Sequence, residues 1–261
     1  MARVFHLFSG SSGNCILISS KGHNFLIDIG VSAKRCENAL LSVGVEPNDI
    51  DAIFITHEHK DHACGVRVFA SRHNTPVFAS QKCLDAMYDN GYLNDKVNAE
   101  KIEYRLDMCD TEILTFQQSH DSADCIGYRF NLSSGKSVCV CTDTGYVTDN
   151  AREVCTGTDL IFIESNHEVS LVQTGSYPYP LKQRILGTRG HLSNYACGEF
   201  MQELAKSGTT RFVLSHLSRE NNMPDIARQS AIASLSELGL KENVDFVLSV
   251  SSPESTRGIA L

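Results

Sequence analysis

The sequence predicts an α+β fold in which two β-sheets pack face to face and carry helices outside, a four-layer αβ/βα sandwich. Short apolar runs rich in β-branched residues, separated by turn formers, dominate the start of the chain. Strand-sized and helix-sized segments then alternate, and the same order, strand-rich and then mixed, recurs in the second half. The length of 261 residues leads us to predict a single domain over 1–261.

In the first half, turn clusters such as SGSSGN at 9–14 separate the strands. Helices are expected after Ser32 and after Ser80, two side chains suited to capping a helix N-terminus, with ends at Gly44 and Gly91. A further helix follows a His-rich loop. We predict strands at 4–8, 15–19, 25–29, 52–56 and 76–79.

The second half repeats this alternation. The segment SSGK at 133–136 is typical of a hairpin turn. Helices are expected at 194–206 and 225–238. We predict strands at 112–117, 126–132, 137–141, 160–163 and 211–214, and a last strand at 246–250 that closes the chain.

The composition is that of an ordinary globular protein, with 42% hydrophobic and 21% charged residues. The longest apolar runs are strand-sized, and no secretory signal is evident at the N-terminus, so we expect no membrane association. Ten scattered cysteines indicate a reduced, cytoplasmic protein more than a disulfide framework. Nothing in the sequence indicates an obligate protein partner.

The net charge of −8 argues weakly against nucleic acid as a ligand, because duplex-binding proteins are usually basic. Metal ions in a cleft would supply local positive charge, however, and some acidic side chains would serve as metal ligands. The charge therefore leaves a nucleic-acid substrate open.

The decisive segment is THEHKDH at 56–62, directly after a predicted buried strand. His57 and His59 alternate in an extended loop, so both imidazoles can point the same way. Asp61 and His62 follow at the first turn of a helix, a few ångströms away. This geometry suits two neighbouring metal ions, and imidazole with carboxylate suits zinc, manganese or iron.

This HxHxDH motif after a buried strand resembles the signature of the metallo-β-lactamase superfamily. Further motifs follow in the family's order: FLIDIG with Asp28, SH with His120, CTDTG with Asp143 and LSHLS with His216. The resemblance implies the four-layer metallo-β-lactamase sandwich, and it covers nearly the whole chain.

The resemblance also implies a ligand set. His57, His59 and His120 would bind one metal, Asp61, His62 and His216 the other, and Asp143 both. Asp28 would support the metal loop from behind. Two metals about 3.5–4 Å apart generate hydroxide from water at neutral pH, and Asp61 would aim it.

A second segment, GHLSN at 190–194, lies where ribonuclease Z-like members of the superfamily carry a Gly-His-Ser-type motif. The resemblance implies that His191 contacts the scissile phosphate and binds no metal. Ser193 is also suited to capping the helix that follows, whose free N–H groups would favour an anion. A plain loop histidine is the alternative.

The stretch 169–198 contains no acidic residue but three basic ones, Lys182, Arg184 and Arg189, interleaved with Tyr177 and Tyr179. Such a segment can follow a phosphate backbone and stack on bases. A solvated surface loop is nearly as good an interpretation.

Loops at 9–14, 164–167 and 217–222 resemble those of the YycJ/WalJ-like branch of the superfamily, bacterial proteins associated with 5′→3′ DNA exonuclease activity. Glu168 follows His167, the last residue of the second loop, where the branch often has Asp. The loops would contact the substrate, DNA, through Ser11, Ser12, Asn14, His167, Ser218 and Asn221.

We therefore predict a dinuclear phosphodiesterase, with Asp61 and His191 as its catalytic residues. A small-molecule hydrolase acting on a lactone, thioester or cyclic phosphate is the alternative, and it would need a compact apolar pocket beside the metals. A binding module without activity is disfavoured by the complete ligand set.

Overall fold

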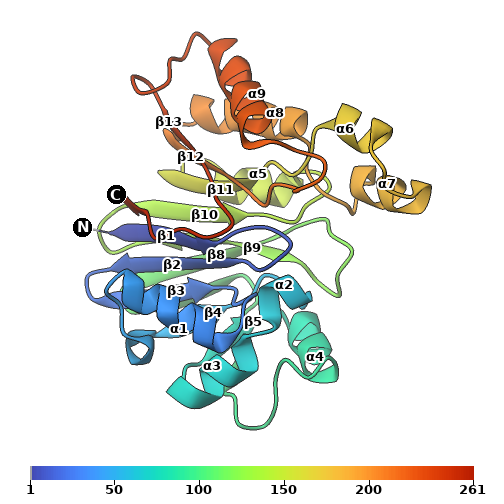
Figure 1. Ribbon diagram of the computed structural model, residues 1–261. Coiled ribbons are helices and arrows are strands. Elements are labelled where there is room, and N and C mark those ends of the chain that lie inside the picture. The colour runs from blue at the N-terminus through green and yellow to red at the C-terminus, as the bar shows by residue number, and fades with distance from the viewer. Residues whose placement is uncertain (1) are drawn as a thin grey trace.

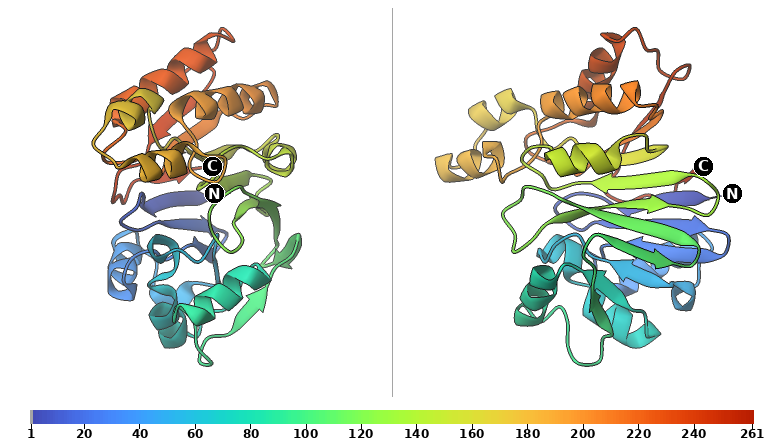
Figure 2. Two further views of the ribbon diagram at one scale, coloured as in Figure 1. Left: turned by 90° about the vertical axis from the view of Figure 1, so that its right-hand side faces the viewer. Right: turned by 180° about the vertical axis from the view of Figure 1, so that it is seen from behind.

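The computed structural model describes residues 2–261 and consists of two seven-stranded sheets that pack face to face, with helices on both outer faces (Figures 1 and 2). This confirms the predicted αβ/βα sandwich. In spatial order the first sheet contains β14 (Gly258–Ala260), β1 (Arg3–Phe8), β2 (Cys15–Ser20), β3 (His23–Ile27), β4 (Ala52–Phe54), β5 (Val77–Ala79) and β6 (Ala99–Lys101). The second contains β13 (Val247–Val250), β12 (Arg211–Ser215), β11 (Leu160–Glu164), β10 (Ser137–Cys141), β9 (Ile126–Asn131), β8 (Thr111–Gln117) and β7 (Arg105–Met108).

The two sheets are built alike. Strands from β14 to β3 pair antiparallel and strands from β3 to β6 pair parallel. In the second sheet β7 to β10 are antiparallel and β10 to β13 parallel. Each sheet therefore gathers the carboxyl ends of several strands at one edge, which is where open sheets place their binding sites.

Helices cover the outer face of each sheet. The first sheet carries α1 (Ala33–Ser42), the short η1 (Pro47–Asp49), α2 (Lys60–Ala63), α3 (Val66–His73) and α4 (Gln81–Asp89). The second carries α5 (Asp149–Cys155), α8 (Asn194–Lys206) and α9 (Pro224–Ser236). Two further helices, α6 (Val169–Thr174) and α7 (Tyr179–Leu186), project together beyond one end of the second sheet (Figure 1). No helix within residues 2–261 is long and apolar enough to cross a membrane.

The core between the sheets is aromatic. Phe25 and Phe54 of the first sheet meet Phe130 of the second, with ring centroids 5.7 and 5.2 Å from its own. Along β3, Phe25 and Ile27 face this inter-sheet core, while Leu26 between them packs under the helices. This two-residue alternation is what β-geometry dictates for a strand buried on both faces.

Most predicted elements are confirmed, two of them, 137–141 and 194–206, to the residue. The three predicted caps are present, since Ser32, Ser80 and Ser193 each accept a hydrogen bond from a backbone N–H three residues ahead. Strands predicted to end at positions 29 and 56 end two residues earlier, at Ile27 and Phe54, because the chain leaves the sheet there.

The sequence interpretation missed α5, α6, α7, β6 and β7, and it was wrong about where the chain closes. The last strand is β14, which pairs antiparallel with β1 in the first sheet. A three-residue strand has too little periodicity to be recognised in the sequence. It forms because it pairs with the edge of a sheet that is distant in the sequence.

Candidate metal centre

The residues predicted to bind metal lie just after strands that run in one direction within each sheet. His57 follows β4 of the first sheet, and His120, Asp143 and His216 follow β8, β10 and β12 of the second. Because these carboxyl ends meet at one edge of the sandwich, residues far apart in the sequence converge there.

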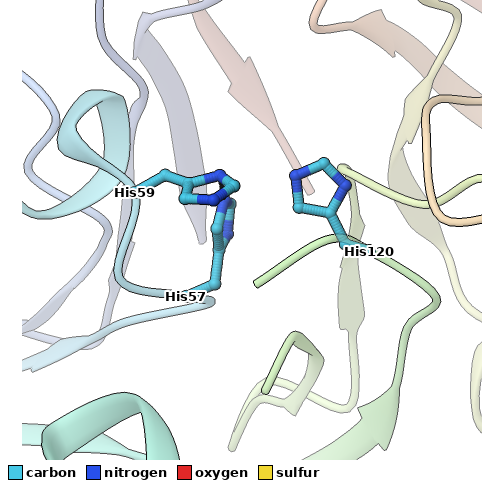
Figure 3. A group of neighbouring side chains, drawn as sticks. All are labelled: His57, His59 and His120. Atoms are coloured by element: carbon cyan, nitrogen blue, oxygen red, sulfur yellow. Dashed lines mark hydrogen bonds between the residues drawn. The ribbon is translucent and has the colours of Figure 1, made fainter. Parts of the chain in front are cut away.

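Three imidazoles form the first group. The ligand atoms of His57, His59 and His120 lie within 4.8 Å of one another, and His57 Nε2 is 3.0 Å from His59 Nδ1. Figure 3 shows His57 and His59 on one loop and His120 facing them from the other side. Three imidazole nitrogens directed at one point match a metal site of the kind that zinc occupies.

The second group is formed by Asp61, His62 and His216. Asp61 Oδ2 lies 3.7 Å from His62 Nε2 and 3.9 Å from His216 Nε2. Asp143 lies between the two groups, with Oδ2 at 3.4 Å from His62 Nε2 and Oδ1 at 4.0 Å from His120 Nε2. Its carboxylate is therefore placed to reach both groups.

Four of these imidazoles are held by the nitrogen that faces away from the centre, so that the other nitrogen points inward. Such outer partners set the tautomer and the ring orientation of metal-binding histidines. The pairs are His57 Nδ1 with Thr56 Oγ1 (3.0 Å), His62 Nδ1 with Asp28 Oδ2 (2.8 Å), His120 Nδ1 with the Gly190 carbonyl (3.1 Å) and His216 Nδ1 with Glu164 Oε1 (2.8 Å).

Two buried polar atoms show that the centre suits a cation. Asp143 Oδ2 and His216 Nε2 have no hydrogen-bond partner among residues 2–261, although buried polar groups are almost always paired. Both atoms point into the cluster, and nitrogen with carboxylate oxygen is the donor set of zinc, manganese and iron. The fold and these clusters imply that the protein binds divalent metal.

Backbone strain marks the same positions. Asp28, Asp143 and His216 have φ values of 62°, 63° and 56°, in the left-handed region that non-glycine residues seldom adopt. Each such conformation costs about 1–3 kcal/mol and persists only where the surroundings enforce it. The strained residues are thus the ones whose side chains form the centre or support it.

The loop that bears Asp61 and His62 is held from behind by the first sheet. The Asn14 N–H donates to the Asp61 carbonyl (2.8 Å) and the Ile29 N–H to the His62 carbonyl (2.9 Å). A Cβ at Gly30 would overlap the Asp61 carbonyl oxygen, so only glycine fits there. The Asn14 side chain, predicted to bind substrate, is buried and places Nδ2 3.0 Å from His62 Nε2.

Glu164 is the functional residue that the sequence interpretation missed. This fully buried carboxylate at the end of β11 accepts hydrogen bonds from His191 Nδ1 and His216 Nδ1, both at 2.8 Å. It also accepts the N–H groups of Thr144 and Leu192. Glu164 thus positions a candidate metal ligand and the candidate catalytic histidine together. The available signal was an acidic residue ending an otherwise apolar strand, LIFIE.

The carboxylates of the centre change the protonation of its histidines. Burial lowers the pKa of His191, but the charge and hydrogen bond of Glu164 outweigh burial and raise it above the usual value. Burial also acts downward on His62, whose pKa is nevertheless raised to about 9 by Asp143, Asp28 and Asp61. Glu164 therefore favours the protonated form of His191 next to the cluster.

Glu164→Gln is expected to lower the pKa of His191 below that of a free imidazole. The carboxamide keeps the shape but supplies no negative charge, so burial then dominates and disfavours the imidazolium. An NMR titration of the zinc-loaded protein measures this. Glu153→Gln on the surface of α5 is the control, and an unchanged His191 pKa in Glu164→Gln would contradict the assignment.

Four of the predicted substrate contacts gather at one cavity of about 210 Å³, which opens beside the metal centre. These residues are Ser11, Arg184, His191 and Ser218. His191 is one-fifth exposed, and its ring centroid lies 5.1 Å from that of His120 and 5.2 Å from that of His216. The structure thus places His191 beside the candidate metal cluster, and its catalytic role stays a prediction.

The other predicted contacts make hydrogen bonds within the protein. The hydrogen-bonded pairs are Ser12 Oγ with Arg219, Lys182 Nζ with the Gln173 carbonyl, Arg189 Nε with the His120 carbonyl, Ser193 Oγ with the Ala196 N–H, and the Asn221 N–H with Ser218 Oγ. His167 is buried, and its Nδ1 has no partner within residues 2–261. Whether these residues touch substrate stays a prediction.

The fold and the site together define a metallo-β-lactamase-type hydrolase. The chain belongs to the β-lactamase superfamily, since the family model described as "Beta-lactamase superfamily domain" matches residues 23–217. This confirms the resemblance carried by the HxHxDH motif.

Two bacterial relatives are similar over nearly their whole length. The chain is 36% identical over 253 residues to exodeoxyribonuclease WalJ of Streptococcus pneumoniae serotype 2 (strain D39), covering 95% of this chain and 94% of the relative. It is 32% identical over 252 residues to exodeoxyribonuclease YycJ of Bacillus anthracis, with the same coverage. The predicted similarity to the YycJ/WalJ-like branch is therefore confirmed.

A solved structure agrees on the fold. The metallo-β-lactamase fold protein YhfI from Bacillus subtilis superposes with a TM-score of 0.72 at 17% identity, covering 97% of this chain and 98% of that protein.

Proposed function

We propose that this protein is a dinuclear metal-dependent phosphodiesterase that degrades DNA from a 5′ end. The observation that supports it most is His191, which lies at the rim of the candidate metal cluster with its Nδ1 2.8 Å from Glu164, a carboxylate that favours the protonated imidazole. A proton donor in that position suits a reaction whose leaving group is an alkoxide oxygen. The choice of DNA is supported by the activity for which the two bacterial relatives are named.

We assign two divalent ions, zinc, manganese or iron, to the seven ligands. His57, His59 and His120 would hold the first ion, and Asp61, His62 and His216 the second, with Asp143 shared. When bound, the ions would activate a water molecule and neutralise charge on the scissile phosphate.

The chain's own groups complete the chemistry. Burial would raise the pKa of Asp61, but His62 and His216 outweigh it and hold the pKa well below its usual value. Asp61 is therefore a carboxylate, able to accept a hydrogen bond from the attacking water and direct it. His191 gives its proton to the leaving oxygen, and Glu164 stabilises the imidazolium until then.

A path for the strand follows from two cavities that share Ser11. One is the 210 Å³ cavity beside His191, and the other, about 450 Å³, lies across Asp61 and includes Lys60 and Arg35. We assign backbone phosphates to Arg184, Arg35 and Lys60, which line these cavities, and to Lys182 and Arg189 from the same segment as Arg184. Cationic contacts of this kind bind nucleic acid without sequence preference.

We also place the protein in the cytoplasm. All ten cysteines are free thiols in the structure, and free thiols persist in reducing compartments.

The proposal predicts the polarity of degradation. Duplex DNA labelled at the 5′ end should release its label at the start of the reaction, whereas the same duplex labelled at the 3′ end should release it last. Covalently closed circles should resist, because they offer no end. Gel electrophoresis of the metal-loaded protein's products measures this. Nicking of closed circles, or shortening from the 3′ end, would show that the polarity is wrong.

A further inference from the structure

The cavity beside His191 has a second wall that the chemistry proposed above does not use. Besides Ser11, Arg184, Ser218 and the two histidines, it is lined by an amide, an aromatic ring and three aliphatic side chains: Asn166, Tyr177, Leu181, Ile185 and Leu217. Tyr177, Leu181 and Ile185 come from α7 and the turn before it. We call this space the α7 cavity.

The character of this wall differs from that of the metal centre. Tyr177 and Leu181 are only half-buried, and Ile185 is buried behind them. An aromatic ring with aliphatic neighbours offers a stacking surface to a nucleobase, which every base can use. The Asn166 amide donates to the His216 carbonyl (2.9 Å), so it is fixed at the border between this wall and the metal centre.

We infer that the α7 cavity binds the 5′-terminal nucleoside of the DNA strand, the group that leaves on hydrolysis. This inference rests on the proposed function. The cavity volume of about 210 Å³ is below the range of about 300–1,000 Å³ typical of drug-sized ligands. We take this space to hold one nucleoside rather than a dinucleotide, so products should be mononucleotides.

The position of His191 fits a leaving nucleoside in this cavity. The water oxygen forms a bond to phosphorus, and the bond from phosphorus to O3′ of the terminal nucleoside breaks. The electron pair of that bond stays on O3′, which takes the proton from His191 at the cavity wall. The shortened strand keeps a 5′-phosphate and can enter the site again.

Charge at the cavity agrees with a nucleotide rather than an uncharged ligand. Arg184 lies on the wall, paired with Asp121, and Arg219 donates a hydrogen bond to Ser12, the residue after Ser11 of the wall. We expect these two guanidinium groups to bind the 5′-phosphate of the seated nucleotide.

The test combines a change in the DNA with a change in the protein. Metal-loaded wild-type protein is given a single strand whose 5′-terminal nucleotide lacks its base, and a matched strand that lacks the base at the third position. Removing the terminal base should slow release of the first nucleotide about 5- to 150-fold, the range for loss of one stacked base. Removing the third base should leave the first step unchanged.

Tyr177→Ala should slow release of the first nucleotide from the intact strand to a similar extent. It should also abolish the difference in rate between intact and terminally abasic strands, because the effects of changing two groups in contact are not additive. Leu181→Trp, which fills the cavity, should reduce kcat/KM for both strands. Tyr179→Ala is the matched control, since Tyr179 is two residues away, 73% exposed and outside the cavity. Thermal unfolding of each variant checks that it is folded.

The outcomes separate this inference from the proposed function. Equal rates on intact and terminally abasic strands, with mononucleotides still released from 5′ ends, would overturn the α7 cavity as a nucleoside site and leave the exonuclease in place. Hydrolysis of methyl 4-nitrophenyl phosphate without any degradation of DNA would overturn both. Products of two or more nucleotides from the first cleavage would also overturn the inference.

Discussion

Asp143→Ala is expected to lower metal affinity at both positions and to abolish hydrolysis. Its carboxylate lies 3.4 Å from His62 Nε2 on one side and 4.0 Å from His120 Nε2 on the other, so no other residue substitutes for it. Residues that only support a ligand change metal affinity about 10–100-fold when replaced, and a shared ligand should cost at least that much. Elemental analysis after dialysis against buffered metal measures the occupancy.

His216→Ala is the informative comparison for that variant. His216 groups with Asp61 and His62 and not with His57, His59 and His120, so the substitution should weaken the second metal more than the first. Wild-type protein should bind two metals per chain. A single metal at saturation, or loss of only one metal in Asp143→Ala, would contradict the shared-ligand assignment.

His191→Ala is expected to keep both metals and to lose about 10²–10⁴-fold in kcat, the range for one acid–base or charge-stabilising group. Its Nδ1 is engaged by Glu164 and lies 3.8 Å from Asp143 Oδ1, and it is not one of the seven proposed ligands. Single-turnover rates on a labelled strand, with metal content determined in parallel, measure the effect.

His167→Ala gives the matched control for this second prediction. His167 is a second histidine near Glu164, but its pKa is lowered by burial to about 4, so it is neutral and cannot give a proton near pH 7. It should lose far less activity than His191→Ala. A fully active His191→Ala variant, or one that loses a metal, would refute the role of His191.

The convergence of the candidate metal ligands could be predicted because their pattern is local and their order is regular. Four of them fall within the seven residues 56–62, and His120, Asp143 and His216 each follow a recognisable strand. Strand direction alone brings such residues to one edge of a sheet. The same regularity predicted the sandwich from the repeated order of strands and helices.

Glu164 could not be predicted in the same way, because its role depends on partners 27 and 52 residues further along the chain. An isolated acidic residue at the end of an apolar strand more often marks a turn to solvent. Only the parallel pairing of β11 with β12 places it beneath His191 and His216.

The α6–α7 region was missed for a different reason. Its helices have six and eight residues and are separated by Gly175 and Pro178, so the segment resembles a loop. Tyr177 and Tyr179 are equivalent in the sequence, yet one lines the cavity and the other is exposed. How α7 packs at the end of the second sheet decides which of the two tyrosines lines the cavity.

The most direct test of the central claim compares substrate classes on one preparation. Zinc-loaded and manganese-loaded protein are incubated with 5′-labelled DNA and RNA and, in parallel, with a β-lactam, a lactone and a thioester, each at matched concentration. We expect DNA to be hydrolysed fastest and the β-lactam little or not at all, with activity lost on chelation and restored by metal. Turnover of the lactone or thioester far faster than any phosphodiester would contradict this expectation and identify a small-molecule hydrolase instead.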